Sequence, residues 1–283
     1  MSCPVCFSTE VKTTFKDSRD NFKIEIHQCL NCGHHYQPEA NYQEIYTTGE
    51  FTQEARQGSV TPDNSKIKEL DRRALKRVHY YREFIDQMDR ILEVGSSIGS
   101  FVHVLKLYGK VSWGLEPDPG YANYSVNQYG FQQYQGLLEE FNPEQKFGGI
   151  CCFHTLEHVR DPHEFLKGCS AILDASGKAL FELPSLELHM YGSMKNTFWK
   201  PHIHYFTRAS LYQLFSQYFE VEALGFYGSA LYVFGIKSKQ PTFKKSVFKS
   251  EKRKASQAKN LVNLFPEIPV KLAKISAKQL LMQ

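Results

Sequence analysis

The sequence predicts an α/β protein in which a doubly wound, mostly parallel seven-stranded sheet follows a small cysteine-rich unit. Three observations predict this fold class. Short apolar segments alternate with helical patterns along residues 66–236, a glycine-containing turn follows the first of these segments, and two Cys-x-x-Cys pairs stand near the N-terminus. Strands that alternate with helices are typical of a parallel sheet covered by helices on both faces.

The elements of the sheet follow in order along the chain. Apolar residues at helical spacing predict an amphipathic helix over residues 65–88. Strands are predicted at residues 90–94, 111–115, 131–134, 149–153, 178–183, 219–224 and 231–236. Helices are predicted from residue 100 to 108, over 119–128, from 154 through 173 and over 208–218. We expect the last two strands, which flank a turn-prone segment, to pair antiparallel.

The composition of the 283-residue chain is that of a globular protein. Hydrophobic residues make up 42% and aromatic residues 14%, which excludes a disordered or collagen-like chain. We expect no membrane-spanning helix, because no segment approaches about 20 apolar residues, and no secretion signal. The seven cysteines then indicate reduced thiols or metal ligands in a cytoplasmic protein, not a disulfide framework.

Composition and charge divide the chain into four parts. Residues 1–40 hold four of the cysteines, residues 41–65 read as a polar linker, residues 66–236 form the α/β domain, and residues 237–283 form a basic tail. The tail has twelve Lys or Arg and two acidic residues, so it carries +10 of a total of +4, and the remainder carries −6. A basic surface over the whole protein, typical of nucleic-acid binding, is not indicated. We expect a solvated, charged helix followed by a packed C-terminal segment; docking of the tail on RNA or on an anionic membrane is the alternative.

The two cysteine pairs, Cys3-x-x-Cys6 and Cys29-x-x-Cys32, predict a metal site. A two-residue gap lets both thiolates of a pair converge on one tetrahedral ion, and Gly33 allows the tight turn of a zinc knuckle. Four thiolates complete the coordination of Zn²⁺, so the pattern predicts a small structural zinc ribbon over residues 1–40. The alternative is two pairs of free or redox-active thiols.

A strand-to-helix turn at residues 93–99, Glu-Val-Gly-Ser-Ser-Ile-Gly, predicts a ligand site. Its glycines let the backbone approach a ligand closely, and the helix N-terminus presents N–H groups to it. Glu116 ends the next strand, where a carboxylate can accept hydrogen bonds from both hydroxyls of a ribose. Three interpretations compete: a dinucleotide-binding turn, whose G-x-G-x-x-G pattern is absent; the G-x-S-x-G nucleophile elbow of a hydrolase at Ser97; and a turn for S-adenosylmethionine (SAM).

Motifs along the central part of the chain favour the third interpretation. They are Ile91-Leu92-Glu93-Val94-Gly95-x-x-x-Gly99-x-Phe101, Gly114-Leu115-Glu116-Pro117, and the segment from Phe147 through His154, Glu157 and His158 to Asp161-Pro162. With these motifs in this order, residues 65–236 resemble the class I SAM-dependent methyltransferases of Rossmann-like fold, in particular the methyltransferase-23-like group.

The resemblance implies SAM as the cofactor. It places the methionine part at the glycine turn, the ribose at Glu116, the adenine at the backbone near Leu138 and the sulfonium beside Phe153. The residues implied to bind the cofactor are Glu93, Gly95, Ser96, Gly99, Glu116, Leu138 and Phe153. Three positions depart from the family pattern: Ser97 replaces a glycine, Leu137 stands where an acid often contacts adenine, and Gly148 replaces an aspartate.

Histidines supply the candidate catalytic groups. His154, Glu157 and His158 are spaced i, i+3 and i+4, so they share one face of the helix predicted there. A neutral imidazole can deprotonate an acceptor hydroxyl. Alternatively, the string is similar to the E-x-x-E-H of metal-assisted quinone and small-RNA 2′-O-methyltransferases, with His154 in place of the first Glu, which implies a divalent metal held by His154, Glu157, His158 and a distant histidine. Helix packing, or the H-x-x-E-H pattern of zinc proteases, is the remaining alternative.

A second histidine cluster, residues 199–207, follows the fifth strand, where open α/β sheets bind ligands. His202 is the second candidate base, and His204 serves either the site or the core. Similar H-x-x-Y-F-[ST] strings occur in zinc-ribbon-bearing sugar C-methyltransferases. The aromatic residues Tyr191, Phe198 and Trp199 suit either stacking on a sugar or packing within a loop.

Together these features predict an enzyme that transfers the SAM methyl group in line to a small hydroxylated acceptor, a sugar or nucleotide-sugar, with a histidine as general base. Two alternatives remain. One is an RNA methyltransferase that grips RNA with the ribbon and the tail, and the other is a non-catalytic SAM- or zinc-binding scaffold. The sequence does not predict the oligomeric state.

Overall fold

A computed structural model gives the fold of the protein. It describes residues 2–19, 21, 23–38, 40, 64–190 and 197–239. Most of the predicted linker, Tyr191 and the predicted basic tail from residue 240 onward lie outside the described residues. Within the described part of the chain, no helix is both long and apolar enough to cross a membrane.

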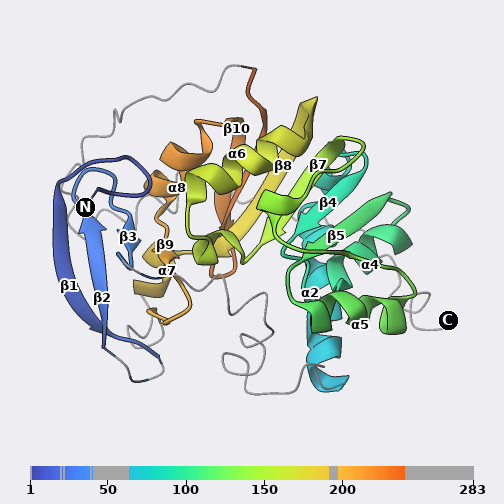
Figure 1. The fold of residues 1–283 in the computed structure, drawn as a ribbon, viewed down its shortest axis with the longest axis horizontal. Coiled ribbons are helices and arrows are strands. Elements are labelled where there is room, and N and C mark those ends of the chain that lie inside the picture. The colour runs from blue at the N-terminus through green and yellow to red at the C-terminus, as the bar shows by residue number, and fades with distance from the viewer. Residues whose placement is uncertain are drawn as a thin grey trace. The chain divides into compact units, whose positions relative to one another are not determined.

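The central sheet has seven strands in the order β10-β11-β8-β7-β4-β5-β6. Figure 1 shows its neighbouring strands β8, β7, β4 and β5. Strands β4 to β8 pair parallel with one another, whereas β11 pairs antiparallel with both β8 and β10. The predicted mostly parallel, seven-stranded sheet is therefore confirmed, as is its closing antiparallel pair. The strands are Ile91–Val94 (β4), Ser112–Glu116 (β5), Tyr134–Gln135 (β6), Phe147–Phe153 (β7), Leu173–Pro184 (β8), Phe219–Tyr227 (β10) and Ala230–Lys237 (β11).

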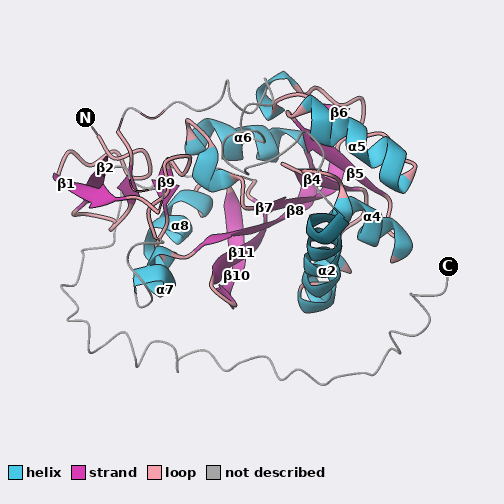
Figure 2. Ribbon diagram, turned by 90° about the horizontal axis from the view of Figure 1, so that it is seen from below, coloured by secondary structure: helices cyan, strands magenta, loops and turns pink. Residues whose placement is uncertain are grey.

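Helices cover both faces of this sheet, and Figure 2 shows α2 and α6 on opposite sides of it. Cys151 and Leu180 pack with α2 and α4, whereas the next residues along the same strands, Cys152 and Phe181, pack with α6 and α8. Successive residues of a strand point to opposite faces, so β7 and β8 are buried on both sides. The helices are Asn64–Tyr80 (α2), Arg82–Ile85 (α3), Ser100–Leu107 (α4), Pro119–Tyr129 (α5), Pro162–Ile172 (α6), Leu186–Met190 (α7) and Arg208–Phe215 (α8).

Two predicted helices differ from the observed ones. The helix predicted over residues 65–88 is interrupted at Tyr81, whose fully buried side chain turns inward to contact β8. The helix predicted to open at His154 instead begins at Pro162, because Asp161 caps it and proline fits its first turn. The segment before it forms a short 3₁₀ turn, Leu156–His158 (η3).

The cysteine-rich unit builds a second, antiparallel sheet that takes one strand from a distant part of the chain. Its strands are Val11–Asp17 (β1), Lys23–Cys29 (β2), His35–Tyr36 (β3) and His204–Tyr205 (β9). Strand β9 lies between α7 and α8 in the sequence and pairs with β3 (Figure 1). All four cysteines of the unit belong to the same buried cluster as Phe206 and Leu211. The two parts predicted from composition therefore share a sheet and a core.

Candidate active site

The turn between β4 and α4 forms one wall of a cavity of about 290 Å³ at the carboxyl ends of the parallel strands. Gly95 and Gly99 have φ of 75° and 84°, the left-handed region that favours glycine. A Cβ on Gly95 would collide with the Thr155 hydroxyl, so glycine is what lets this turn approach the end of β7. Ser97 Oγ has no hydrogen-bond partner among the described residues, which disfavours the nucleophile-elbow interpretation because such a serine needs a base.

Two acidic residues face the cavity from the ends of adjacent strands. Glu116 accepts hydrogen bonds from the N–H of Ser97 at 2.6 Å and of Asp118 at 3.0 Å. Glu93 is buried, and burial raises its pKa well above the ordinary value. Its Oε2 has no hydrogen-bond partner in the described residues. A buried acceptor of this kind suits a cationic or hydrogen-bonding ligand group.

The cavity wall includes six of the seven residues predicted to bind the cofactor, the exception being Gly99, which caps α4. Leu138 begins the 3₁₀ turn Leu138–Glu140 (η2) and lines the cavity, and its contact with the adenine stays a prediction. The Ser96 hydroxyl donates a hydrogen bond to the side chain of Gln133, so Ser96 would meet a ligand through its backbone. Phe153 ends β7 and lies under the Arg77 guanidinium, 4.5 Å from the ring centre.

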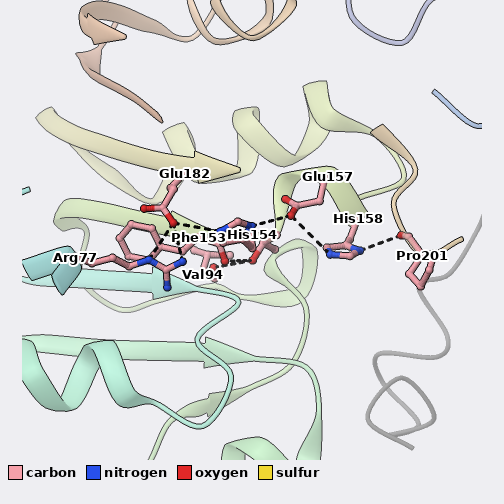
Figure 3. Close-up of polar contacts among 9 residues, drawn as sticks. Arg77, Val94, Phe153, His154, Glu157, His158, Glu182 and Pro201 are labelled. Carbon is pink, nitrogen blue, oxygen red and sulfur yellow. Dashed lines mark hydrogen bonds and ion pairs between the residues drawn. The ribbon is translucent and has the colours of Figure 1, made fainter. Parts of the chain in front are cut away.

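Beside Phe153, polar contacts run from α2 to the turn after β7 (Figure 3). His154 Nε2 lies 3.2 Å from Glu182 Oε1, and its Nδ1 lies 3.4 Å from Glu157 Oε1. Glu182 also accepts from Arg77 Nη2 at 2.7 Å and from the Tyr81 hydroxyl at 2.8 Å. Burial alone would lower the pKa of His154, but the two carboxylates outweigh it and raise that pKa to about 9. His154 is therefore held as a cation at neutral pH.

His158 also lines the cavity and shares Glu157 with His154, since its Nε2 lies 3.9 Å from Glu157 Oε1. Its Nδ1 lies 2.9 Å from the carbonyl oxygen of Pro201. Because a carbonyl only accepts, Nδ1 carries the hydrogen, and in the neutral ring Nε2 is the basic nitrogen. The His202 ring lies 4.7 Å from that of His158, although His202 is not among the residues that line the cavity. The structure thus brings the three predicted catalytic histidines together around Glu157.

Glu157, His158 and His202 have the chemistry of a metal site. One ligand atom of each lies within 4.8 Å of the others. The Glu157 side chain is 2% exposed, and neither of its oxygens accepts a hydrogen bond within the described residues. The His154 cation, 3.4 Å from Glu157 Oε1, compensates part of the charge of this buried carboxylate, and a metal ion at the cluster would compensate the rest.

The four N-terminal cysteines converge on one point. Cys3 Sγ lies 3.6 Å from Cys32 Sγ, and Cys6 Sγ lies 3.5 Å from Cys29 Sγ. All four sulfurs are within 4.8 Å of one another, close to the ~3.8 Å edges of a tetrahedron with Zn–S bonds of about 2.3 Å. Contact with Cys29 and burial raise the pKa of the Cys3 and Cys32 thiols, so a metal ion would have to displace their protons. The geometry fits Zn²⁺.

Part of the second histidine cluster serves packing. Phe198 is buried against Tyr205, which leaves it no exposed stacking surface, and the Arg19 guanidinium covers one face of the Trp199 ring at 3.6 Å. His204 is 2% exposed and belongs to the core.

Sequence reasoning missed Arg77, Tyr81 and Glu182. Two signals were present in the sequence: Glu182 interrupts an apolar strand, and Arg77 and Tyr81 share a helical face at i, i+4.

Comparison with known proteins connects this site to a family. The sequence model described as "Methyltransferase domain" matches residues 67–223, more than half of the chain. The ubiquinone biosynthesis O-methyltransferase of Coxiella burnetii is 30% identical over 97 residues. That match covers 32% of this chain and 42% of the relative, so the chain spans less than half of the relative's length.

Solved structures share the fold at low sequence identity. A SAM-dependent methyltransferase of Thermotoga maritima, named as a possible histamine N-methyltransferase, has a TM-score of 0.51 and 20% identity over 69% of this chain and 100% of that chain. A protein from Pyrococcus horikoshii has a TM-score of 0.52 and 12% identity over 70% of this chain and 100% of that chain.

Proposed function

This chain belongs to the family of class I SAM-dependent methyltransferases, and we propose that it transfers the SAM methyl group to an oxygen of a small hydroxylated acceptor. One observation carries the proposal. A single cavity runs from the Gly95 turn and the Glu116 carboxylate to the histidines after β7. SAM bound along it would point its sulfonium towards Phe153 and His154, and Glu93 would meet the methionine end.

The reaction is an in-line displacement. The acceptor oxygen forms a bond to the methyl carbon as the carbon–sulfur bond breaks, and the hydroxyl proton passes to a base. His158 is the residue we assign as base, because the Pro201 carbonyl fixes its Nδ1–H and leaves Nε2 basic. His154, held between Glu157 and Glu182, orients the site and shapes its charge. Alignment of the two reactants supplies most of the rate.

A second mechanism is favoured by the buried Glu157 carboxylate. A divalent cation bound by Glu157, His158 and His202 would lower the pKa of the acceptor hydroxyl and remove the need for a protein base. Stimulation of turnover by added Mg²⁺ or Mn²⁺, and its loss in Glu157→Gln, would select this mechanism. Equal turnover with and without added cation would select His158 as base.

The four cysteines are assigned to a structural Zn²⁺. Four buried thiols complete its coordination and leave no position for a substrate. Metal analysis of the purified protein checks this, with one equivalent of zinc expected and none in a Cys3→Ser, Cys6→Ser double variant.

The acceptor class rests on three points. The curated relative is an O-methyltransferase, which supports oxygen as the methylated atom. The histidine-rich end of the cavity is polar and includes Thr155 and Arg160, which suit a hydroxylated acceptor with an anionic group. A nucleotide-sugar combines both features, and the similarity of residues 202–207 to sugar methyltransferases agrees with it.

Calorimetric titration with S-adenosylhomocysteine (SAH) tests the cofactor assignment. Wild type is expected to bind, and Glu116→Ala to bind at least about tenfold more weakly, since hydrogen bonds to a charged group contribute about 1.5–3 kcal/mol. Glu144→Ala, an exposed carboxylate lost elsewhere, is the matched control. No binding to folded wild type would overturn the proposal. Labelled SAM with a panel of sugar nucleotides and RNA then tests the acceptor: label in RNA alone would overturn the sugar class.

A further inference from the structure

The buried side chain of Gln37 links the cysteine-rich unit to the loop at residues 199–203. This residue follows β3 and is 8% exposed. Its amide nitrogen donates to the carbonyl oxygens of Lys200 at 2.8 Å and His202 at 2.6 Å, with that of Trp199 at 3.5 Å. Its backbone N–H donates to the carbonyl oxygen of Ile203 at 2.9 Å. A single residue thus gathers the backbone of the loop that carries His202.

A second contact runs through two buried histidines. His204 Nε2 lies 3.0 Å from the Val159 carbonyl oxygen, so that nitrogen carries the hydrogen and Nδ1 accepts from His34 Nε2 at 3.1 Å. His34 stands two residues after Cys32, and the β3–β9 pairing aligns its neighbours. This second link therefore joins the cysteine cluster to the turn that holds Glu157 and His158.

The loop held by Gln37 in turn fixes the catalytic groups. Ile203 N–H donates to the Glu157 carbonyl oxygen at 2.8 Å, and the Pro201 carbonyl accepts from His158 Nδ1 at 2.9 Å. The Pro201 carbonyl therefore selects the His158 tautomer. The carbonyls on either side of it in the sequence, those of Lys200 and His202, accept hydrogen bonds from Gln37. The residues that face SAM, at the Gly95 turn and Glu116, make none of these contacts.

We infer that the cysteine unit is a positioning element for the methyl-transfer end of the cavity and that Gln37 is its positioning residue. The inference rests on the proposed function for the role of His158, but not for the contacts themselves. By fixing the loop at residues 199–203, Gln37 holds the ring and tautomer of His158 and the position of His202. Loss of the Gln37 amide should therefore disturb the histidines at the methyl-transfer end of the cavity and leave the affinity for SAM unchanged.

The test compares Gln37→Met, which keeps the length of the side chain but cannot donate, with Gln28→Met on the neighbouring strand. Trp113→Phe is the background, which leaves Trp199 in the held loop as the one tryptophan of the chain. We expect Gln37→Met to change Trp199 emission and the imidazole NMR signals of His158 and His202, but not the signal of His103 on α4. Affinity for SAH should stay within about twofold of wild type. With an acceptor in hand, kcat should fall about 10- to 100-fold.

Controls separate positioning from loss of fold. The visible spectrum of the cobalt-loaded protein reports whether the cysteine site is intact in each variant. Should Gln37→Met fail to fold, Gln37→Asn keeps the amide and withdraws it from the loop by one methylene. Unchanged Trp199 and His158 signals in a folded variant would overturn the inference, as would equal changes in Gln28→Met. Failure of wild type to bind SAH would instead overturn the proposed function, and the spectroscopic comparison would still decide the role of Gln37.

Discussion

The histidines predicted as catalytic differ in what holds each of them. His154 is an ion-paired cation, whereas a carbonyl fixes the His158 ring with Nε2 as its basic nitrogen. We predict that His158→Gln lowers kcat by about 10²–10⁴-fold with SAH affinity unchanged. His79→Gln, at an exposed histidine of α2, is the control and should behave as wild type. Full turnover of His158→Gln without added cation would remove His158 from the mechanism.

Glu182 gives the protein a pH-dependent stability at acidic pH. Burial would raise its pKa, but His154 and Arg77 outweigh burial and lower that pKa to about 2, against an ordinary value of 4.5. A depressed folded pKa stabilises the native state above the unfolded value, and the stabilisation is lost as the pH falls from about 4.5 towards 2. Its full size is about 3 kcal/mol.

Urea unfolding at several pH values checks this effect. We predict that the difference in free energy of unfolding between wild type and Glu182→Gln is largest above pH 4.5 and shrinks as the pH falls towards 2. Glu83→Gln, at an exposed residue of α3, should show no such trend. A difference that is constant with pH would mean that Glu182 is not ionised in the folded protein.

Helices α5 and α6 each begin at an aspartate N-cap, but only the cap of α5 lines the cavity. Asp161 accepts from the N–H groups of His163 and Glu164 at the start of α6, and Asp118 accepts from that of Tyr121 at the start of α5. We predict that alanine at either position lowers the free energy of unfolding by about 1 kcal/mol. Asp118 also lines the cavity, so SAH affinity should fall in Asp118→Ala alone. Equal loss of affinity in both variants would show that the effect travels through stability.

The sequence predicted the elements that have a strong local signal. Apolar strands, helix periodicity and the glycine turn placed all seven strands of the central sheet in order. The segment at residues 154–161 was predicted as helix because His154 and His158 have helical spacing, but the Asp161 cap and Pro162 start the helix later. Strand β9 has two residues and pairs with β3, which is distant in the sequence, so no local pattern predicts it.

The residues of the candidate site also differ in how far the sequence predicts them. Gly95 and Glu116 belong to local motifs, so the sequence predicts their place at the ends of neighbouring strands. Gln37, Arg77 and Glu182 act across separations of 105 residues or more, and nothing in one sequence pairs such positions. The same limit applies to His202, whose nearness to His158 depends on the loop held by the cysteine unit.

At the scale of the whole molecule, the cysteine unit and the central sheet are built as one body within the described residues. The Val5 carbonyl oxygen accepts a hydrogen bond from His163 Nε2 of α6 at 3.1 Å, and the Phe7 ring stacks on the His163 ring. The four cysteines share a hydrophobic core with α8. The apolar surface beneath the unit would meet water if it detached, at a cost of about 25 cal/mol per Å². Independent folding of the two parts is therefore not expected.

This shared core predicts how the protein responds to zinc removal. Zinc binding to four thiolates contributes about 10–16 kcal/mol in small peptides, comparable with the 5–15 kcal/mol that stabilise a typical domain. We predict one cooperative thermal transition for the zinc-loaded protein and a large fall in its Tm on chelation, reported equally by Trp113 in the central sheet and Trp199 beside the cysteine unit. Saturating SAH should raise the Tm of that single transition, because it binds the folded protein and not the unfolded chain. The opposite result would be two thermal transitions, with the Tm reported by Trp199 changing only on zinc removal and the Tm reported by Trp113 changing only on SAH addition. That result would show that the two parts unfold separately.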